Sequence, residues 1–116
     1  MNIGNASLCL NVKDIKKACT FYLELGFELV EDHLVQGWVI LKHRAFYLGL
    51  FQGHIKENLL NFRGGHIGEL LKEFEVKRVA IDELEAVNPD GSGSFFIRDL
   101  DGNLLYFDTT IEELES

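Results

Sequence analysis

The hydrophobic pattern of this chain passes through the same order of elements twice. Residues 5–52 predict a strand, a helix and three more strands, and residues 58–110 predict this order again. Neither unit can close by itself, because each would leave one face of its sheet exposed. We therefore expect a single α+β domain over residues 1–116, in which two βαβββ repeats form a curved mixed sheet with the helices on its outer face.

The first repeat has the clearer local signals. Apolar and polar residues alternate over 7–12, which predicts a strand with one buried face. Apolar residues at positions 15, 18, 19, 22 and 23 then mark one face of a helix, which Asp14 can cap at its start and Gly26 can end. Three strands are expected over 27–32, 37–42 and 45–52, joined as hairpins.

The second repeat is expected to begin with a strand over 59–63, which ends in a Gly-Gly turn. Apolar residues at positions 67, 70, 71 and 74 predict the second helix. A strand of open boundaries lies within 79–87, and Asn88-Pro89-Asp90-Gly91 predicts a turn after it. Two further strands are expected over 94–99 and 104–109, and the acidic tail 111–116 is expected to be short or frayed.

The formal net charge of −8 comes from 11 basic and 19 acidic residues. The densest basic group is Lys13, Lys16 and Lys17, which is too small for a phosphate-binding face, so neither nucleic acid nor an anionic membrane is expected as a partner. No apolar run has the length of a membrane span, and the first residues lack the features of a secretory signal. With two cysteines, Cys9 and Cys19, we expect a cytoplasmic protein in which both are reduced and buried.

Two motifs inside the repeats resemble those of a known superfamily. Phe21-Tyr22 and Leu25-Gly26-Phe27 reproduce its "FY…LGF" helix ending, and residues 95–105 resemble its "F…DPDGN" hairpin, with leucine at position 100 where proline is common. On these motifs the chain resembles the glyoxalase/bleomycin-resistance/dioxygenase (vicinal oxygen chelate) superfamily. The resemblance spans nearly the whole chain and implies the fold expected above.

The resemblance also implies four metal-ligand positions, on the first and fourth strands of each half. Counting from the motifs places them at Ser7, Gly49, Leu59 and Tyr106. Metal-dependent members carry His, Glu or Gln there, because divalent metals need such nitrogen and oxygen donors. The four residues present do not supply that donor set, and a shift of one position does no better. We therefore expect neither a metal nor another cofactor.

The four histidines do not form a metal site either, because none has a second histidine four positions away. His33 and His43 fall in or beside hairpin turns, and His54 lies in the connection between the halves. His66 is expected in the first turn of the second helix. No Ser–His–Asp set, phosphate-binding glycine loop or Cys–His pair is visible, so the catalytic residues, if any exist, are unknown.

Without a metal, the expected site is the inward face of the strands, where aromatic and polar side chains would line a small-molecule cavity. Phe51 and Phe96 can equally be plain packing, and Trp38 can serve a dimer interface. The predicted ligand-binding residues are Ser7, Cys9, Trp38, Tyr47, Phe51, Asn61, Arg63, Phe96, Arg98 and Tyr106, with Asn11, Gly49, Leu59 and Asp108 on the same face.

The two arginines of this face need an anionic partner, because a guanidinium on an otherwise apolar surface is costly without one. That partner is either the carboxylate of a ligand or one of two neighbouring aspartates, Asp99 and Asp108.

Three functions are open. The first is a metal-free binding protein of the bleomycin-resistance kind, a homodimer that holds small aromatic or anionic ligands. The second is a glyoxalase-like lyase or isomerase, in which Asp108 would have to act as the general base. The third is an interaction module whose cavity is filled by its own side chains. Fold alone does not choose among them.

Overall fold

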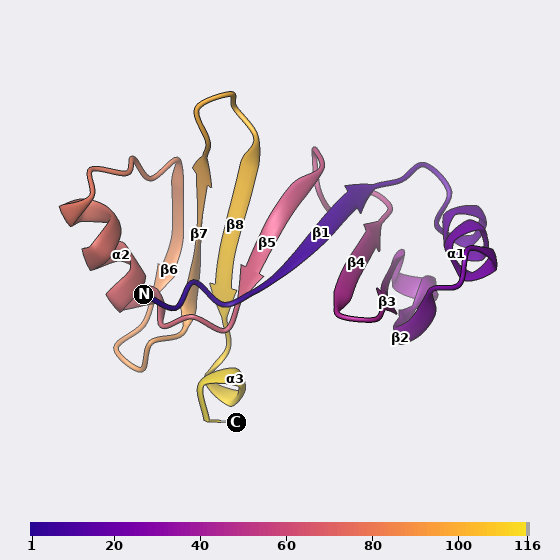
Figure 1. The fold of residues 1–116 in the computed structure, drawn as a ribbon, viewed down its shortest axis with the longest axis horizontal. Helices are drawn as coiled ribbons and strands as arrows, with labels where there is room; N and C mark the ends of the chain where they lie inside the picture. The colour runs from indigo at the N-terminus through magenta and orange to yellow at the C-terminus, as the bar shows by residue number, and fades with distance from the viewer. Residues whose placement is uncertain (116) are drawn as a thin grey trace. The chain divides into compact units, whose positions relative to one another are not determined.

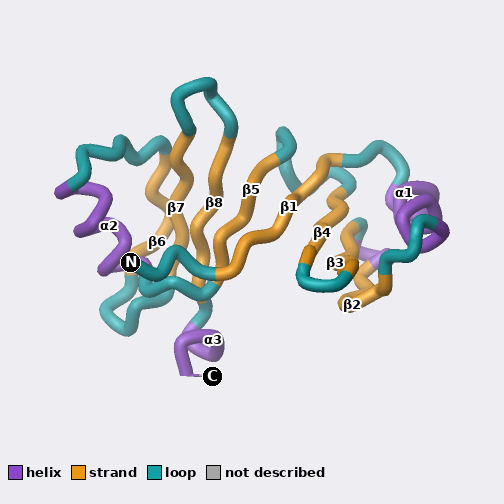
Figure 2. Tube along the Cα trace, viewed as in Figure 1, coloured by secondary structure: helices purple, strands orange, loops and turns teal. Residues whose placement is uncertain are grey.

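The computed structural model describes residues 1–115, in which eight strands and two long α-helices follow one another in the predicted order, and a third, short helix ends the described chain (Figure 1). The chain divides into two compact units. The N-terminal unit is Ser7–Leu59, and the C-terminal unit consists of Met1–Ala6 and the chain from Leu60 onward. Figure 2 shows the strands and helices of each unit along the trace.

The N-terminal unit has a four-stranded mixed sheet in the order β2-β3-β4-β1. Strand β1 is parallel to β4, and the other neighbours are antiparallel. The elements are β1 (Asn5–Asn11), α1 (Ile15–Glu24), β2 (Glu28–His33), the 3₁₀ turn η1 (Leu34–Gln36), β3 (Trp38–His43) and β4 (Phe46–Phe51).

Helix α1 begins and ends as its sequence predicts. The Asp14 carboxylate accepts a hydrogen bond from the Lys17 amide at 3.1 Å, and Gly26 takes the left-handed conformation with a φ of 110°. The buried face of the helix packs on the side chains of the sheet that point toward it. This core consists of Ile15, Cys19, Val39, Leu41, Leu48 and Leu50.

The C-terminal unit repeats this plan, with the strand order β5-β8-β7-β6. Its pairs β6–β7 and β7–β8 are antiparallel. The elements are β5 (Leu59–Arg63), α2 (Ile67–Val76), β6 (Glu83–Val87), β7 (Gly93–Arg98), β8 (Leu104–Thr109) and α3 (Ile111–Glu115).

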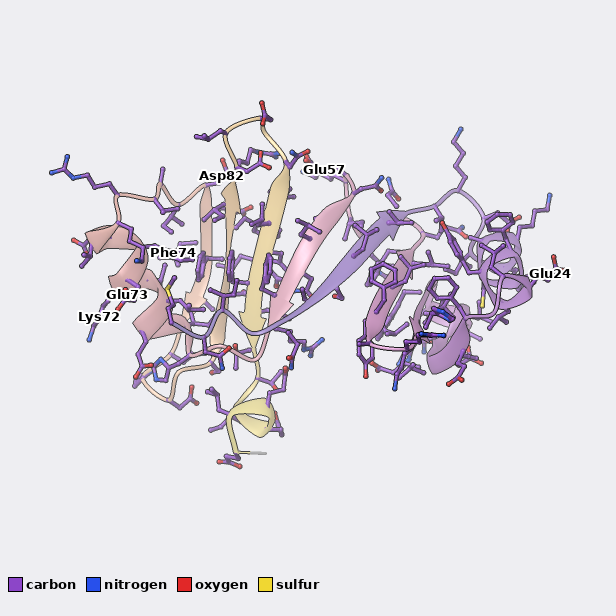
Figure 3. All side chains as sticks on the ribbon, viewed as in Figure 1. Glu24, Glu57, Lys72, Glu73, Phe74 and Asp82 are labelled. Carbon is purple, nitrogen blue, oxygen red and sulfur yellow. The ribbon has the colours of Figure 1, made fainter. Side chains whose placement is uncertain are left out.

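Helix α2 covers one face of this second sheet. Its Phe74 side chain is buried and points toward the strands, whereas Lys72 and Glu73 point away (Figure 3). His66 is the N-cap and not a first-turn residue, since its Nδ1 accepts the Glu69 amide at 3.2 Å. The core of this unit consists of Ile67, Leu70, Phe74, Phe95, Ile97 and Phe107.

A β-bulge interrupts the outer strand of each unit. The register of β2 with β3 shifts between Leu29 and Glu31, and that of β6 with β7 shifts between Leu84 and Ala86. A bulge adds one residue to a strand and changes the direction of the side chains around it. The two bulges occur at equivalent places in the two units, so equivalent residues of the two sheets can be matched from them.

The predicted elements are confirmed with small changes of boundary. The uncertain strand within 79–87 is confined to Glu83–Val87. The acidic tail is more ordered than predicted, because Ile111–Glu115 forms the helix α3. None of the helices within residues 1–115 is long and apolar enough to cross a membrane.

Candidate functional site

In each unit, the sheet face opposite the helix carries the residues predicted for ligand binding. In the N-terminal unit the register brings Ser7 of β1 opposite Tyr47 of β4. Tyr47 is 37% exposed, and the Lys42 ammonium lies 5.7 Å from the centre of its ring. These two predicted residues therefore lie side by side on a partly exposed surface.

An aromatic row crosses the same face at the other end of the strands. The ring of His33 stacks on Trp38 with 3.9 Å between ring centres, and Trp38 stacks on Phe51 at 5.8 Å. The ring of His54 then meets the edge of Phe51 at 6.4 Å. Trp38 and Phe51, both predicted, are thus brought together, while the two histidines of the row were not predicted to join them.

Part of this face is already covered by the protein. A Cβ built on Gly49 would lie 2.6 Å from Cε2 of Phe51 and 3.4 Å from the sulfur of Cys9. Cys9 is only 7% exposed. The Phe51 ring therefore fills the space beside Gly49, and Cys9 lies on the predicted face but beneath the surface.

The C-terminal unit presents a polar face opposite α2. The Asn61 amide of β5 donates to the Asp108 carboxylate at 2.8 Å and to the Tyr106 backbone carbonyl at 3.1 Å. Asp108 in turn lies opposite Ser94 of β7. Burial raises the pKa of Asp108, against the lowering effects of the Asn61 hydrogen bond and the Arg63 charge.

The rings of Phe96 and Tyr106 stack next to these polar groups, with 4.3 Å between their centres. Burial raises the pKa of Tyr106 to about 12; interaction with Ser94 opposes this rise and the Glu85 carboxylate adds to it. The Tyr106 side chain is therefore a neutral phenol that can donate or accept a hydrogen bond at neutral pH.

Glu85 belongs to this face and was missed by the sequence analysis. The Ser94 hydroxyl donates to its carboxylate at 2.8 Å. Glu85 lies two residues after Glu83, which pairs with Phe96, so alternation along β6 puts Glu85 on the same face. It was missed because the boundaries of this strand and its pairing with β7 were left open in the sequence analysis.

Both arginines of the predicted site have carboxylate partners within the protein. Arg63 donates from Nε to Glu113 at 2.8 Å, and its Nε lies 3.9 Å from Asp108. Arg98 donates from Nη1 to a backbone carbonyl at 2.9 Å, and its Nε lies 3.8 Å from Asp82.

The expectation that Asp99 could be an arginine's partner was wrong. Its carboxylate accepts hydrogen bonds from the Asn103 amide groups at 2.8 Å and from the Asp101 backbone at 2.9 Å, which shapes the turn between β7 and β8. Asp108 is the expected partner that does lie near Arg63, although Glu113 is nearer.

The residues at the implied metal positions do not fit a divalent metal. Aligning the two units on their bulges makes Tyr47, opposite Lys42, equivalent to Tyr106, opposite Phe96, so the repeat favours Tyr47 over Gly49 as the second position. Both candidates lack a carboxylate or imidazole, and Leu59 is a buried hydrocarbon. Within residues 1–115, no three His, Cys, Asp or Glu side chains are grouped so that they could hold a metal ion.

A surface depression of about 430 Å³ lies on the C-terminal unit, away from the predicted ligand residues. It is open, and its walls come from the start of α2 and the turn after β6. The residues that line it are His66, Gly68, Glu69, Lys72, Val87, Asn88 and Pro89.

The sequence matches no protein-family model and no curated protein. Solved structures do match. An NAD-dependent benzaldehyde dehydrogenase from Legionella pneumophila aligns with a TM-score of 0.73 and 18% identity, over 90% of this chain and 97% of that one. The 2,3-dioxygenase LapB from Pseudomonas sp. KL28 aligns with a TM-score of 0.57 and 17% identity, over 90% of this chain and 41% of that one.

A third matching structure is named as a member of a superfamily. A glyoxalase/bleomycin resistance protein/dioxygenase superfamily member from Vibrio splendidus 12B01 aligns with a TM-score of 0.67 and 18% identity. The alignment covers 90% of this chain and 97% of that one. Together with the two βαβββ units and the motifs at their ends, this match shows that the chain has the fold of the glyoxalase/bleomycin-resistance/dioxygenase superfamily.

Proposed function

We propose that this chain is a small-molecule-binding domain that needs no metal and holds an aromatic ligand on the polar face of its C-terminal unit. The observation that carries the proposal is the stacked pair of Phe96 and Tyr106 beside the hydrogen-bonded pair of Asn61 and Asp108. Aromatic surface with a few converging polar groups is the usual composition of a small-molecule site. We further propose that the two units act as one domain.

The charged residues of the chain indicate which charge an aromatic ligand can carry. The chain from residue 60 onward contains thirteen acidic and five basic residues, whereas residues 1–59 contain six of each. On the polar face, Arg63 is the group that can attract a carboxylate, while Asp108 and Glu85 favour neutral or cationic groups. A carboxylate-bearing aromatic ligand must therefore use Arg63.

A thermal-shift assay with three matched compounds tests the proposal. Benzyl alcohol, benzoate and benzylamine share one ring and differ in charge, and a ligand at about 100 times its dissociation constant adds about 2.7 kcal/mol to the free energy of unfolding. We expect at least one to raise the melting temperature. Phe96→Leu should remove that increase, whereas Tyr47→Leu in the N-terminal unit should retain it. If none of the three compounds has an effect, the proposed site is wrong.

A second candidate function is that of a lyase or isomerase with Asp108 as general base. Its raised pKa supports this role, because a carboxylate with a raised pKa is a stronger base. Incubation with phenylacetone in deuterated buffer, followed by NMR, measures proton abstraction from carbon directly. Exchange above the buffer rate that is lost in Asp108→Asn supports the enzyme, and exchange at the buffer rate overturns it.

An interaction module with a filled cavity is favoured by one observation, the packing of Phe51 beside Gly49 in the N-terminal unit. This candidate predicts that no small molecule binds the sheet face of either unit. The same three compounds separate it from the binding proposal, because a melting-temperature increase that depends on Phe96 contradicts it.

We also propose a cytoplasmic homodimer. A run of contacting rings, Phe21, Tyr22, Phe27 and Phe46, lies on the N-terminal unit, and Phe21 and Phe46 are 56% and 45% exposed. Exposed apolar patches commonly mark interfaces. Light scattering should give twice the monomer mass, and a monomer mass at all concentrations overturns the dimer. The two cysteines are free and buried, which suits a reducing compartment.

A further inference from the structure

An ion pair ties the C-terminal helix α3 to the polar face. Arg63, the last residue of β5, donates from Nε to Oε1 of Glu113 at 2.8 Å. The Arg63 side chain is 52% exposed and that of Glu113 is 28% exposed. Asp108, at 3.9 Å from the same nitrogen, is the more distant of the two carboxylates. Of these two carboxylates, Glu113 is therefore the nearer anion to Arg63, the cation beside the polar pair of Asn61 and Asp108.

The same Glu113 oxygen also holds the start of α3. It accepts hydrogen bonds from the Thr110 hydroxyl at 2.9 Å and the Thr110 amide at 3.2 Å, while the Thr110 hydroxyl accepts the Glu113 amide at 3.3 Å. This is a capping box, in which two helix-start amides are satisfied reciprocally. Burial alone would raise the pKa of Glu113, but the hydrogen bonds from Arg63 and Thr110 outweigh it and leave the pKa lowered. Glu113 is thus an anion at neutral pH.

We propose that Glu113 is an internal carboxylate that occupies the anion-binding group of the site, so that a ligand carboxylate must compete with it for Arg63. An arginine can bind a carboxylate through two parallel N–H groups, and an entering ligand with this geometry displaces the Nε contact of Glu113. Helix α3 then loses its tie to β5. This inference rests on the proposed function and adds to it a restraint against anionic ligands.

The test compares Glu113→Gln with Glu112→Gln. Glutamine preserves the capping box, because its side-chain oxygen can still accept from Thr110, and removes the anion that pairs with Arg63. Glu112→Gln removes the same charge from an exposed neighbour in the same helix. We expect Glu113→Gln to tighten benzoate binding about twofold to fivefold relative to benzyl alcohol, the range for removal of a partly exposed ion pair, and Glu112→Gln to leave the ratio unchanged.

A second measurement follows α3 itself. In the parent protein, saturating benzoate should speed hydrogen exchange of the Glu113 and Leu114 amides, and benzyl alcohol should not. If the two glutamine variants change the ratio of benzoate affinity to benzyl alcohol affinity equally, the inference is overturned. Binding of benzyl alcohol in that case still supports the proposed function. Binding of none of the three compounds overturns both. An unchanged exchange rate at Glu113 with benzoate bound overturns the displacement of α3.

Discussion

The ring of Phe51 packs against the backbone of Gly49, where a Cβ would come within 2.6 Å of the ring carbon Cε2. Both residues lie on β4, two positions apart, so their side chains share the face opposite α1. The neighbouring Cys9 sulfur would be 3.4 Å from the same Cβ. Glycine is required here for space, and its φ is not in the left-handed region.

Gly49→Ala should therefore destabilise the protein by about 1–3 kcal/mol, the usual cost of overpacking a closed space. Phe51→Leu should relieve this effect, because the atoms that clash belong to the ring. Urea unfolding of the two single variants and the double variant forms a double-mutant cycle. We expect a coupling energy of at least about 1 kcal/mol. Additive effects would show that the ring does not restrict position 49.

Gly4 has a different requirement, because its φ is 97° and a Cβ would lie 2.6 Å from the Arg63 backbone oxygen. Gly102 has a similar φ of 86° with open space around it. We expect Gly102→Ala to cost about 1–2 kcal/mol from backbone strain, and Gly4→Ala to cost about 1–3 kcal/mol more from the close approach. Thermal melts of both variants measure the difference, and equal costs would contradict the packing of Gly4 against β5.

The sequence predicted the elements well because their patterns are local. Alternation over 7–12 placed Ser7 and Cys9 on the face opposite the helix, and the spacing of apolar residues gave both long helices to within two residues of their ends. The "LGF" motif is reflected in a helix end at Glu24 followed by a left-handed Gly26. These signals depend on neighbours in the chain and not on distant contacts.

The site was harder to predict because its key contacts join strands and segments whose pairing is not written in the local pattern. Glu85 lies on the same face as Glu83, but the boundaries and pairing of this strand were open in the sequence, so its contact with Ser94 was missed. The helix α3 was missed because its only signal is the capping pair of Thr110 and Glu113, which lies three residues later in a tail rich in glutamate. The nearer carboxylate partner of Arg63 was missed with it, because Glu113 is fifty residues away in sequence.

The two neighbouring phenylalanines of β7 lie on opposite faces of the sheet, one in the core and one on the polar face. Phe95 is 0% exposed and stacks on Phe107 at 5.0 Å, whereas Phe96 lies on the polar face. Phe95→Ala should cost about 3–5 kcal/mol, the range for a buried aromatic ring. Phe96→Ala should cost less than about 2 kcal/mol, because its ring is only partly buried. Chemical denaturation tests this order, and a larger cost at Phe96 would reverse the assigned faces.

The N-cap of α1 makes a smaller contribution to stability, and its loss should destabilise the protein. Asp14→Ala removes the acceptor of the Lys17 amide and should cost about 0.5–2 kcal/mol. Asp14→Asn retains an oxygen at the same place and should stay within about 0.5 kcal/mol of the parent. Thermal unfolding of both variants is the measurement. A loss in the asparagine variant as large as in the alanine variant would mean that charge, and not the cap, is what matters.

Asp108 makes the stability of the protein depend on pH. Because burial raises its pKa in the folded state, the fold favours the protonated carboxyl. Its contribution is fully present below the pKa of the unfolded chain and is lost as pH rises through the folded pKa. Asp108→Asn imitates the protonated form and retains an acceptor for Asn61. The variant should therefore equal the parent at about pH 3 and exceed it in free energy of unfolding at neutral pH.

Asp99 provides a control, because its contribution to the free energy of unfolding changes with pH in the opposite direction. The Asn103 side chain and backbone donate hydrogen bonds to its carboxylate and lower its pKa, so its contribution is present above the unfolded pKa and lost as pH falls. Asp99→Asn should be less stable than the parent at neutral pH, and the difference should disappear in acid. Urea unfolding of both variants across this pH range gives two curves that diverge from the parent in opposite directions. Loss of stability in Asp108→Asn at neutral pH would show that its pairing with Arg63 outweighs its burial.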